Sequence, residues 1–227
     1  KILNRVMEDV YQDAIKRKDY SVRTEERDPA GFAIPPYYKK YVKAVLVDED
    51  EIEKRGEVLA GQIADFYKDR PYHIIVTLKG AVDTYALITK YLKKIYTSGK
   101  YMNCTRPEYI KAKSYNNTES SGNVQILKTD EFTVKDKEIL IIEDIIDTGN
   151  TIRALHKKFQ EEGAKDIKIM SMTLKEEPKG VDIDFLGFKV APAFLVGFGL
   201  DYNEALRDLN HICVINDEGI EAFRRKQ

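Results

Sequence analysis

The chain has few of the residues that mark secreted, metal-binding or membrane-spanning proteins. Its two cysteines, Cys104 and Cys213, are too few for a disulfide framework and have no metal-ligand spacing, and the three histidines have none either. No apolar run approaches the length of a membrane span, and the first residues lack the apolar core of a signal peptide. These absences favour a reduced, cytoplasmic protein with no membrane partner.

The chain also has no excess of charge of one sign. The 37 basic and 38 acidic residues give a formal net charge of −1, so no overall positive field would recruit nucleic acid. The 227 residues suffice for one large hydrophobic core, or for one core with a small subdomain. The chain contains no internal repeat and no low-complexity segment.

Hydrophobic periodicity indicates strands that alternate with helices. This alternation predicts an α/β protein with a doubly wound, mostly parallel sheet and flanking helices. The charged stretch at 21–31 reads as a linker, and Gly163 as a left-handed cap of a helix. Helices are expected at about 1–18, 51–67, 82–95 and 150–163, the third with Val82 facing inward, and strands near 44–47, 73–78, 109–115, 123–127, 138–142, 167–174, 194–200 and 211–215.

The most informative stretch runs from Ile139 to Ile152. A run of branched apolar residues, typical of a buried parallel strand, ends at two adjacent acids, Glu143 and Asp144. Ligands of open α/β sheets bind at the carboxyl ends of such strands. Asp147 follows, and the turn at 148–151 then leads into a helical pattern. Free N–H groups at a helix N-terminus are suited to bind a phosphate.

The acid pair and the turn suit different groups of one ligand. Carboxylates repel phosphate, so the acids are expected to face sugar hydroxyls and a cation while the backbone amides face the phosphate. A phosphorylated ribose carries both kinds of group. The alternative is that Glu143 and Asp144 are helix-capping or solvated loop acids. The order of strand, acid pair, third acid and glycine-centred turn favours the ligand site.

This stretch resembles the phosphoribosyl-pyrophosphate motif of the type I phosphoribosyltransferases. LKGA near Leu78, KSYNN near Lys113 and the segment from Val196 to Gly219 are similar to those of hypoxanthine-guanine(-xanthine) phosphoribosyltransferases. The resemblance implies a Mg²⁺-dependent purine-salvage enzyme that joins a 6-oxopurine to phosphoribosyl pyrophosphate, yielding a nucleoside 5′-monophosphate (IMP or GMP) and pyrophosphate. Hypoxanthine and guanine are the expected bases, and xanthine stays open. A non-catalytic protein that senses phosphoribosyl pyrophosphate is the alternative.

The resemblance also implies an organisation for the whole chain. It covers about Ile34 to Gly219, so 31–227 is expected to be the phosphoribosyltransferase domain. Within it, about 31–50 and about 180–227 would form a small hood over the sheet. Residues 1–30 match poorly and are expected to be an N-terminal helix and linker. The family further implies a homodimer or homotetramer.

The family's residue roles transfer first to the ribose and the 5′-phosphate. Glu143 and Asp144 would accept hydrogen bonds from the ribose hydroxyls. Asp147 matches the general base that takes a proton from the purine ring, with helix capping as its alternative. Asn150 stands where the family commonly has lysine. The 5′-phosphate would be held by Thr148, Gly149, Asn150 and Thr151, with Gly149 allowing the backbone to approach closely.

Other matched residues would bind pyrophosphate. Lys79 and Gly80 would offer their backbone to it, and Arg207 would hold it as a planar fork. From spacing alone, Arg207 could equally form a salt bridge with Glu204 or Asp208, and Lys79 could be an ordinary loop residue.

The base site and the lid complete the expected set. Lys175 would donate to the purine 6-oxo group, Phe194 would stack on the base, and Leu195 would supply a backbone contact. Ser114 and Tyr115 match the head of a mobile lid over 116–122. Asp201 would contact the base through its backbone, and Glu143, Asp144 and Asp201 are the candidate Mg²⁺ residues.

Overall fold

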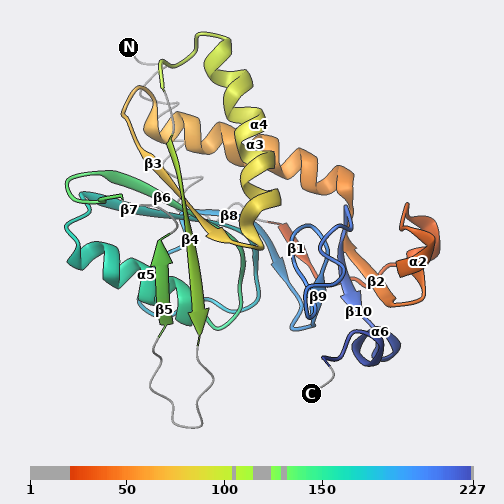
Figure 1. The fold of residues 1–227 in the computed structure, drawn as a ribbon. Coiled ribbons are helices and arrows are strands. Elements are labelled where there is room, and N and C mark those ends of the chain that lie inside the picture. Colours follow the sequence, from red (N-terminus) through yellow and green to blue (C-terminus); the bar gives the residue numbers. More distant parts are fainter. Residues whose placement is uncertain (1–20, 104–105, 115–123, 129–131, 226–227) are drawn as a thin grey trace.

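In a computed structural model, the structure describes residues 21–103, 106–114, 124–128 and 132–225 (Figure 1). Three expectations lie outside these residues: the helix at 1–18, Tyr115, and the lid at 116–122.

A seven-stranded sheet forms the centre of the molecule, in the order β1-β8-β7-β6-β3-β4-β5. Every neighbouring pair is parallel except β4 with β5, which confirms the expected mostly parallel sheet. The strands are β1 (Ser21–Arg23), β3 (His73–Leu78), β4 (Arg106–Ser114), β5 (Val124–Lys128), β6 (Glu138–Ile146), β7 (Asp166–Leu174) and β8 (Phe185–Val190).

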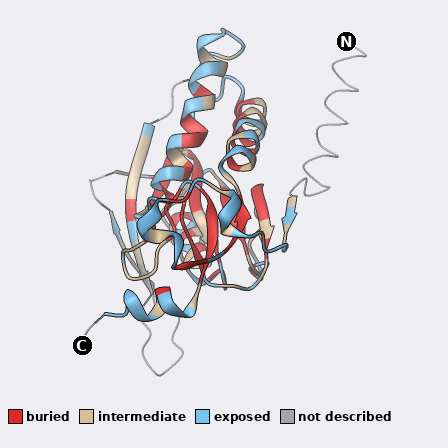
Figure 2. Cartoon of the chain, turned by 90° about the vertical axis from the view of Figure 1, so that its right-hand side faces the viewer, coloured by how far each residue is buried: buried red, intermediate tan, exposed pale blue. Residues whose placement is uncertain are grey.

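Helices cover both faces of this sheet, as the sequence predicted. Helices α3 (Glu49–Tyr67) and α4 (Ala81–Thr97) pack on one face, and α5 (Asn150–Glu161) packs on the other. Along β6, Leu140 and Ile142 belong to the first core while Ile139 and Ile141 belong to the second, because successive side chains of a strand point to opposite faces. Figure 2 shows the buried residues concentrated in the strands. No helix among the described residues is both long and apolar enough to span a membrane.

A second, three-stranded antiparallel sheet lies beside the first, in the order β2-β10-β9. Its strands come from distant parts of the chain, so that residues near the C-terminus pair with residues 42–47 (Figure 1). The strands are β2 (Val42–Val47), β9 (Leu195–Val196) and β10 (Ile212–Ile215), with the short helices η1 (Pro29–Gly31), α2 (Pro36–Lys39) and α6 (Asp217–Ala222) nearby in sequence.

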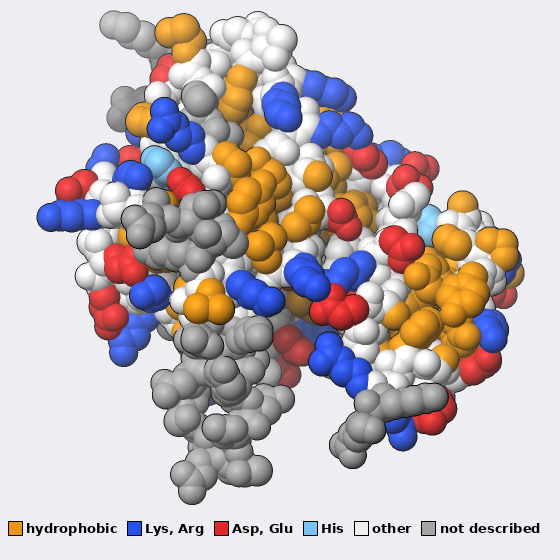
Figure 3. All heavy atoms as spheres, in the orientation of Figure 1, with side chains coloured by type: hydrophobic (Ala, Val, Ile, Leu, Met, Phe, Trp, Pro, Cys, Tyr) orange, Lys and Arg blue, Asp and Glu red, His pale blue; other side chains and the backbone are white. Residues whose placement is uncertain are grey.

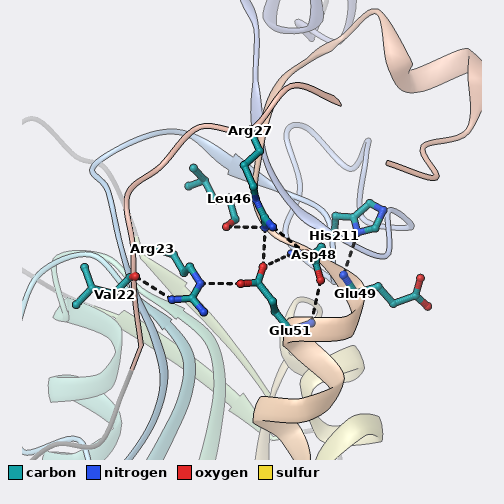
Figure 4. A network of polar contacts seen from close by, with 8 residues as sticks. All are labelled: Val22, Arg23, Arg27, Leu46, Asp48, Glu49, Glu51 and His211. Carbon is teal, nitrogen blue, oxygen red and sulfur yellow. Dashed lines mark hydrogen bonds and ion pairs between the residues drawn. The ribbon is translucent and has the colours of Figure 1, made fainter. Parts of the chain in front are cut away.

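An ion-pair network joins residues before β2 to the start of α3 (Figure 4). Asp48 and Glu51 form a reciprocal capping box at the helix N-terminus. The Arg27 guanidinium donates to both carboxylates, at 2.8 Å to Asp48 and 2.6 Å to Glu51, and Arg23 also pairs with Glu51 at 2.9 Å. His211 Nδ1 accepts a hydrogen bond from the Glu49 backbone at 3.0 Å. The first described residues therefore contact both sheets, because β1 pairs with β8 of the main sheet and Arg27 donates to the Leu46 carbonyl in β2.

Several local predictions were wrong. Ser21–Arg23 form an edge strand of the main sheet instead of a linker. β8 was not predicted, and the strand expected over 194–200 is limited to β9. It ends there because positive φ angles at Gly197 (90°) and Phe198 (50°) turn the chain. Val82 is 42% exposed instead of facing inward. Gly163 has φ +83°, which confirms the predicted cap.

Two glycines of α3 yield a matched prediction. A Cβ at Gly56 would lie 2.5 Å from side-chain carbons of buried Leu87 on α4, whereas a Cβ at Gly61 meets nothing within 4 Å. We expect Gly56→Ala to lower the free energy of unfolding by about 1–3 kcal/mol through overpacking. Gly61→Ala should raise it by about 0.5–1 kcal/mol, since alanine favours helix. Urea unfolding measures both, and equal effects of the two would contradict this packing.

Candidate active site

The adjacent acids Glu143 and Asp144 lie in the carboxyl-terminal half of β6, which continues to Ile146 instead of ending before the acids as predicted. Glu143 is only 6% exposed; its Oε2 accepts a hydrogen bond of 2.6 Å from Thr77 Oγ1 on β3, and its Oε1 is buried without a partner among the described residues. Asp144 Oδ1 accepts from the Ile145 backbone at 2.9 Å. Burial raises the pKa of both carboxyls above the usual range, and the charge of Asp144 raises the pKa of Glu143 further. Near neutral pH this arrangement favours a protonated Glu143 beside an ionised Asp144.

Two glycines bring separate backbone segments against this pair. A Cβ at Gly80, in the turn after β3, would overlap the Asp144 carboxylate. Gly199 has φ +88°, and a Cβ there would overlap the carbonyl oxygen of Gly80. The turn after β3, the end of β6 and the loop after β9 therefore meet closely. The Leu78–Lys79 peptide bond within this contact is cis.

The turn between β6 and α5 leaves the N-terminus of the helix open. Gly149, with φ +76°, is the residue before the first helical residue, and no side chain caps the helix. The first N–H groups of α5 therefore have no capping side chain, and such groups are donors for an anion. Pro178 packs so closely on Gly149 that a Cβ would overlap it. The capping alternative for Asp147 is thus not what the structure shows.

Asp147 instead faces a lysine from the neighbouring strand. Lys175, directly after β7, places its Nζ 3.1 Å from Asp147 Oδ2. The Lys175 backbone donates to the Ile146 carbonyl at 2.9 Å, which fixes its position beside β6. The Lys175 side chain is 14% exposed and the Asp147 side chain 58%. A mostly covered cation and an accessible carboxylate therefore share one side of the site.

A cavity of about 180 Å³ lies between these groups and the segment that runs from just before β9 into the loop after it. Phe194 lies at its edge, 49% exposed, with its ring meeting Tyr202 edge-on at 5.2 Å between centroids. Six of its eight lining residues were predicted from the sequence, and the other two, Ile145 and Leu200, were not. The lining consists of Asp144, Ile145, Asp147, Lys175, Phe194, Leu195, Leu200 and Asp201.

Arg207 lies in an ion-pair cluster at the other end of the site. Its Nη2 is 2.7 Å from Asp201 Oδ1 and 3.6 Å from Glu204 Oε2, and its Nη1 donates to the Gly199 carbonyl at 2.6 Å. Of the two alternative partners expected for Arg207, Glu204 is close, although Asp201 is closer. Lys79 Nζ also reaches Glu204 Oε2, at 2.8 Å.

Ser114 ends β4, where its backbone is in register with Val124 of β5. No cluster of three or more His, Cys, Asp or Glu in the described residues could hold a metal ion. Glu143, Asp144 and Asp201 therefore do not make a complete metal site by themselves.

Sequence reasoning missed two residues that support the site. Thr77, which bonds Glu143, is the one hydroxyl in the apolar strand HIIVTL, and that contrast was a usable signal. Arg153 donates to the Thr148 carbonyl at 3.2 Å and to Asn150 Oδ1. It lies three residues after Asn150 on α5, the spacing at which helix side chains meet. Arg153 thus places a positive charge beside the turn, next to Asn150.

An acid pair near the end of a central parallel strand, beside an open helix N-terminus, is the arrangement that the sequence analysis associated with a site for a phosphorylated ribose. Residues 45–203 match the phosphoribosyl transferase domain family, and the chain belongs to that family.

Known proteins are similar over most of the chain. The hypoxanthine-guanine-xanthine phosphoribosyltransferase of Plasmodium falciparum is 36% identical over 87% of this chain and 87% of its own length. The human hypoxanthine-guanine phosphoribosyltransferase is 36% identical over 85% of this chain and 90% of its own. The crystal structure of the Schistosoma mansoni hypoxanthine-guanine phosphoribosyltransferase, in complex with IMP, has a TM-score of 0.74 at 28% identity, covering 90% of this chain and 99% of that one.

Proposed function

We propose that this protein transfers the phosphoribosyl group of phosphoribosyl pyrophosphate to a 6-oxopurine, as a purine-salvage enzyme. The products are a nucleoside 5′-monophosphate and pyrophosphate. The observation that carries the proposal is one cavity in which Asp144, Asp147 and Lys175 meet beside an open helix N-terminus. The names of the Plasmodium and human relatives support the choice of hypoxanthine and guanine.

Ribose and phosphate would lie across the end of β6. The ionised Glu143 and Asp144 carboxylates accept hydrogen bonds from the ribose 2′ and 3′ hydroxyls. The N–H groups of the turn, with the hydroxyls of Thr148 and Thr151, hold the 5′-phosphate. Arg153 adds positive charge there, which offsets the absence of a charge at Asn150.

Proton transfer falls to Asp147. In the reaction, a purine ring nitrogen forms a bond to the anomeric carbon, and the bond from that carbon to the pyrophosphate oxygen breaks. The ring nitrogen loses its proton, and the Asp147 carboxylate accepts it. Before substrate binds, the Asp147 carboxylate is paired with Lys175 at 3.1 Å.

Base selection falls to the opposite wall of the cavity. Lys175 donates to the 6-oxo group, and an ammonium there disfavours the 6-amino group of adenine. Phe194 stacks on the base, and the backbones of Leu195 and Asp201 contact its other edge. The exposed ring of Phe194 supports this role, since a face left open can receive a base.

Mg²⁺ is the proposed cofactor, held partly by the ligand. Asp144 and Asp201 line the cavity, and Glu143 has a buried oxygen without a partner. Because the described residues form no complete metal cluster, oxygens of pyrophosphate would have to supply the remaining ligands. When bound, the metal neutralises negative charge on the leaving group.

Pyrophosphate would occupy the end of the site bounded by Lys79, Gly80 and Arg207. The close contact of Gly80 with Gly199, whose carbonyl accepts a hydrogen bond from Arg207, supports a common position for these groups. We also propose that Ser114 and Tyr115 begin a lid over the site. The proposed hood, from about 31–50 and about 180–227, would centre on the second sheet. β8 within that range and β1 within residues 1–30 belong to the main sheet instead.

A homodimer or homotetramer is the proposed assembly. Hydrophobic side chains gather over α4 and again near α2 on one face of the molecule (Figure 3). Val82 on α4 is 42% exposed and Tyr37 on α2 is 66% exposed. Exposed apolar patches of this kind favour contact with a further subunit. A cytoplasmic location is proposed from the cysteine usage, with Cys213 free and buried.

Pyrophosphate release tests the function and separates it from the sensing alternative. With Mg²⁺ and phosphoribosyl pyrophosphate, we expect release with hypoxanthine and guanine and none with adenine. Asp147→Asn should slow turnover by about 10²- to 10⁴-fold, the usual contribution of a general base, and should keep the affinity for phosphoribosyl pyrophosphate. Binding of phosphoribosyl pyrophosphate without release for any purine would establish a sensor instead.

Lys175→Ala tests the base site. We expect kcat/KM for guanine and hypoxanthine to fall by the equivalent of about 1.5–3 kcal/mol, the worth of a charged hydrogen bond, with little change in phosphoribosyl-pyrophosphate affinity. Lys179→Ala is the matched control, because Lys179 is exposed and close in sequence. If Lys175→Ala and Lys179→Ala behaved alike in steady-state kinetics, Lys175 would lie outside the base site.

A further inference from the structure

Glu204 lies between the two basic side chains at the pyrophosphate end of the site. Its Oε2 is 2.8 Å from Lys79 Nζ and 3.6 Å from Arg207 Nη2. Lys79 belongs to the turn after β3, and Arg207 to the loop after β9. One carboxylate oxygen therefore connects cations from two separate segments.

The charges of this cluster cancel. Lys79 and Arg207 contribute two positive charges, and Asp201, 2.7 Å from Arg207, contributes a negative charge beside that of Glu204. The hydrogen bond from Lys79 and the nearby positive charges lower the pKa of Glu204, so its carboxyl is ionised at neutral pH. A pyrophosphate that arrives at this end meets cations that are already neutralised.

The backbone holds Glu204 in this position. Its φ is +72° and that of Asn203 is +50°, which form a tight left-handed turn. The Glu204 N–H donates to Asp201 Oδ2 at 2.6 Å, which ties the turn to the residue that pairs with Arg207. The Glu204 side chain remains 50% exposed, so a ligand can displace it without disrupting the core.

We propose that Glu204 sets the affinity for pyrophosphate, because it pairs with Lys79 and Arg207 when no pyrophosphate is bound. The carboxylate competes with pyrophosphate for Lys79 and Arg207, and it takes their place again as the product leaves. It therefore weakens product binding and speeds release. This inference rests on the proposed function, in which Lys79, Gly80 and Arg207 bound the pyrophosphate position.

Glu204→Gln tests the competition directly. We expect the dissociation constant of pyrophosphate with Mg²⁺, measured by calorimetry, to fall about 3- to 10-fold, the size of one partly screened charge. Pyrophosphate release should slow correspondingly. The affinity for GMP should stay within about 2-fold, because its phosphate binds at the α5 turn. Glu161→Gln is the control, since it removes an equal charge from an exposed α5 pair with Lys157.

Glu204→Asp separates contact from charge. Aspartate tolerates a left-handed backbone and keeps the charge, but its side chain is one methylene too short to hold Lys79 at the same distance. We expect pyrophosphate to bind more tightly to this variant also. If Glu204→Asp matched the parent, charge alone would account for the effect and displacement would be refuted.

The remaining outcomes are decisive as well. Unchanged or weaker pyrophosphate binding by Glu204→Gln, with GMP binding intact, would overturn the role of Glu204 and leave the proposed function standing. Failure of the parent protein to bind pyrophosphate at all would refute the proposed function itself.

Discussion

The burial of two adjacent carboxyls at the end of β6 is the constraint on which the site depends. Glu143 is 6% exposed and Asp144 beside it is half-buried in the lining of the cavity, and the only side-chain donor to Glu143 among the described residues is Thr77. Burying like-charged groups together is unfavourable, and proteins relieve it by protonation or by a ligand. The described residues alone therefore give these two carboxyls too few hydrogen-bond donors, and no directly paired cation, to stabilise both of them in the ionised form. Under the proposed function, a ribose diol would supply the donors and Mg²⁺ would supply the positive charge.

The surrounding site is electrostatically paired before any ligand arrives. Lys175 holds Asp147 at 3.1 Å, Lys79 holds Glu204 at 2.8 Å, and Arg153 bonds the Asn150 side chain. These pairs join residues that the proposed reaction would use separately. Under that proposal, ligand binding would exchange the internal pairs for contacts to phosphate and base. Such exchanges involve partly exposed side chains, whose ion pairs are weak in water. A ligand would therefore need to displace only weak side-chain pairs, without unfolding the loops.

Patterns local in sequence predicted much of this arrangement. The apolar run of β6, the acids at its end and Gly149 before α5 could be read directly, because strand burial and helix starts leave local signals. β8 was missed because no helix separates it from β7 and because Gly187 and Lys189 interrupt its apolar residues. The pairing of Lys175 with Asp147, and the contact of Gly80 with Asp144, depend on strand order. Spacing along the chain carries no information on that order.

The most direct measurement is the number of protons released when GMP and Mg²⁺ bind near neutral pH, from calorimetry in buffers of different ionisation enthalpy. Burial raises the pKa of Glu143 and Asp144, and hydrogen bonds from ribose hydroxyls or a nearby cation would lower it again. The account predicts net proton release by the parent protein and less release by Glu143→Gln. The variant also serves as the control for protons that the nucleotide phosphate loses on binding, because that contribution is the same in both proteins. Equal release by both proteins would contradict it, since the buried pair would then not ionise to hold the ribose.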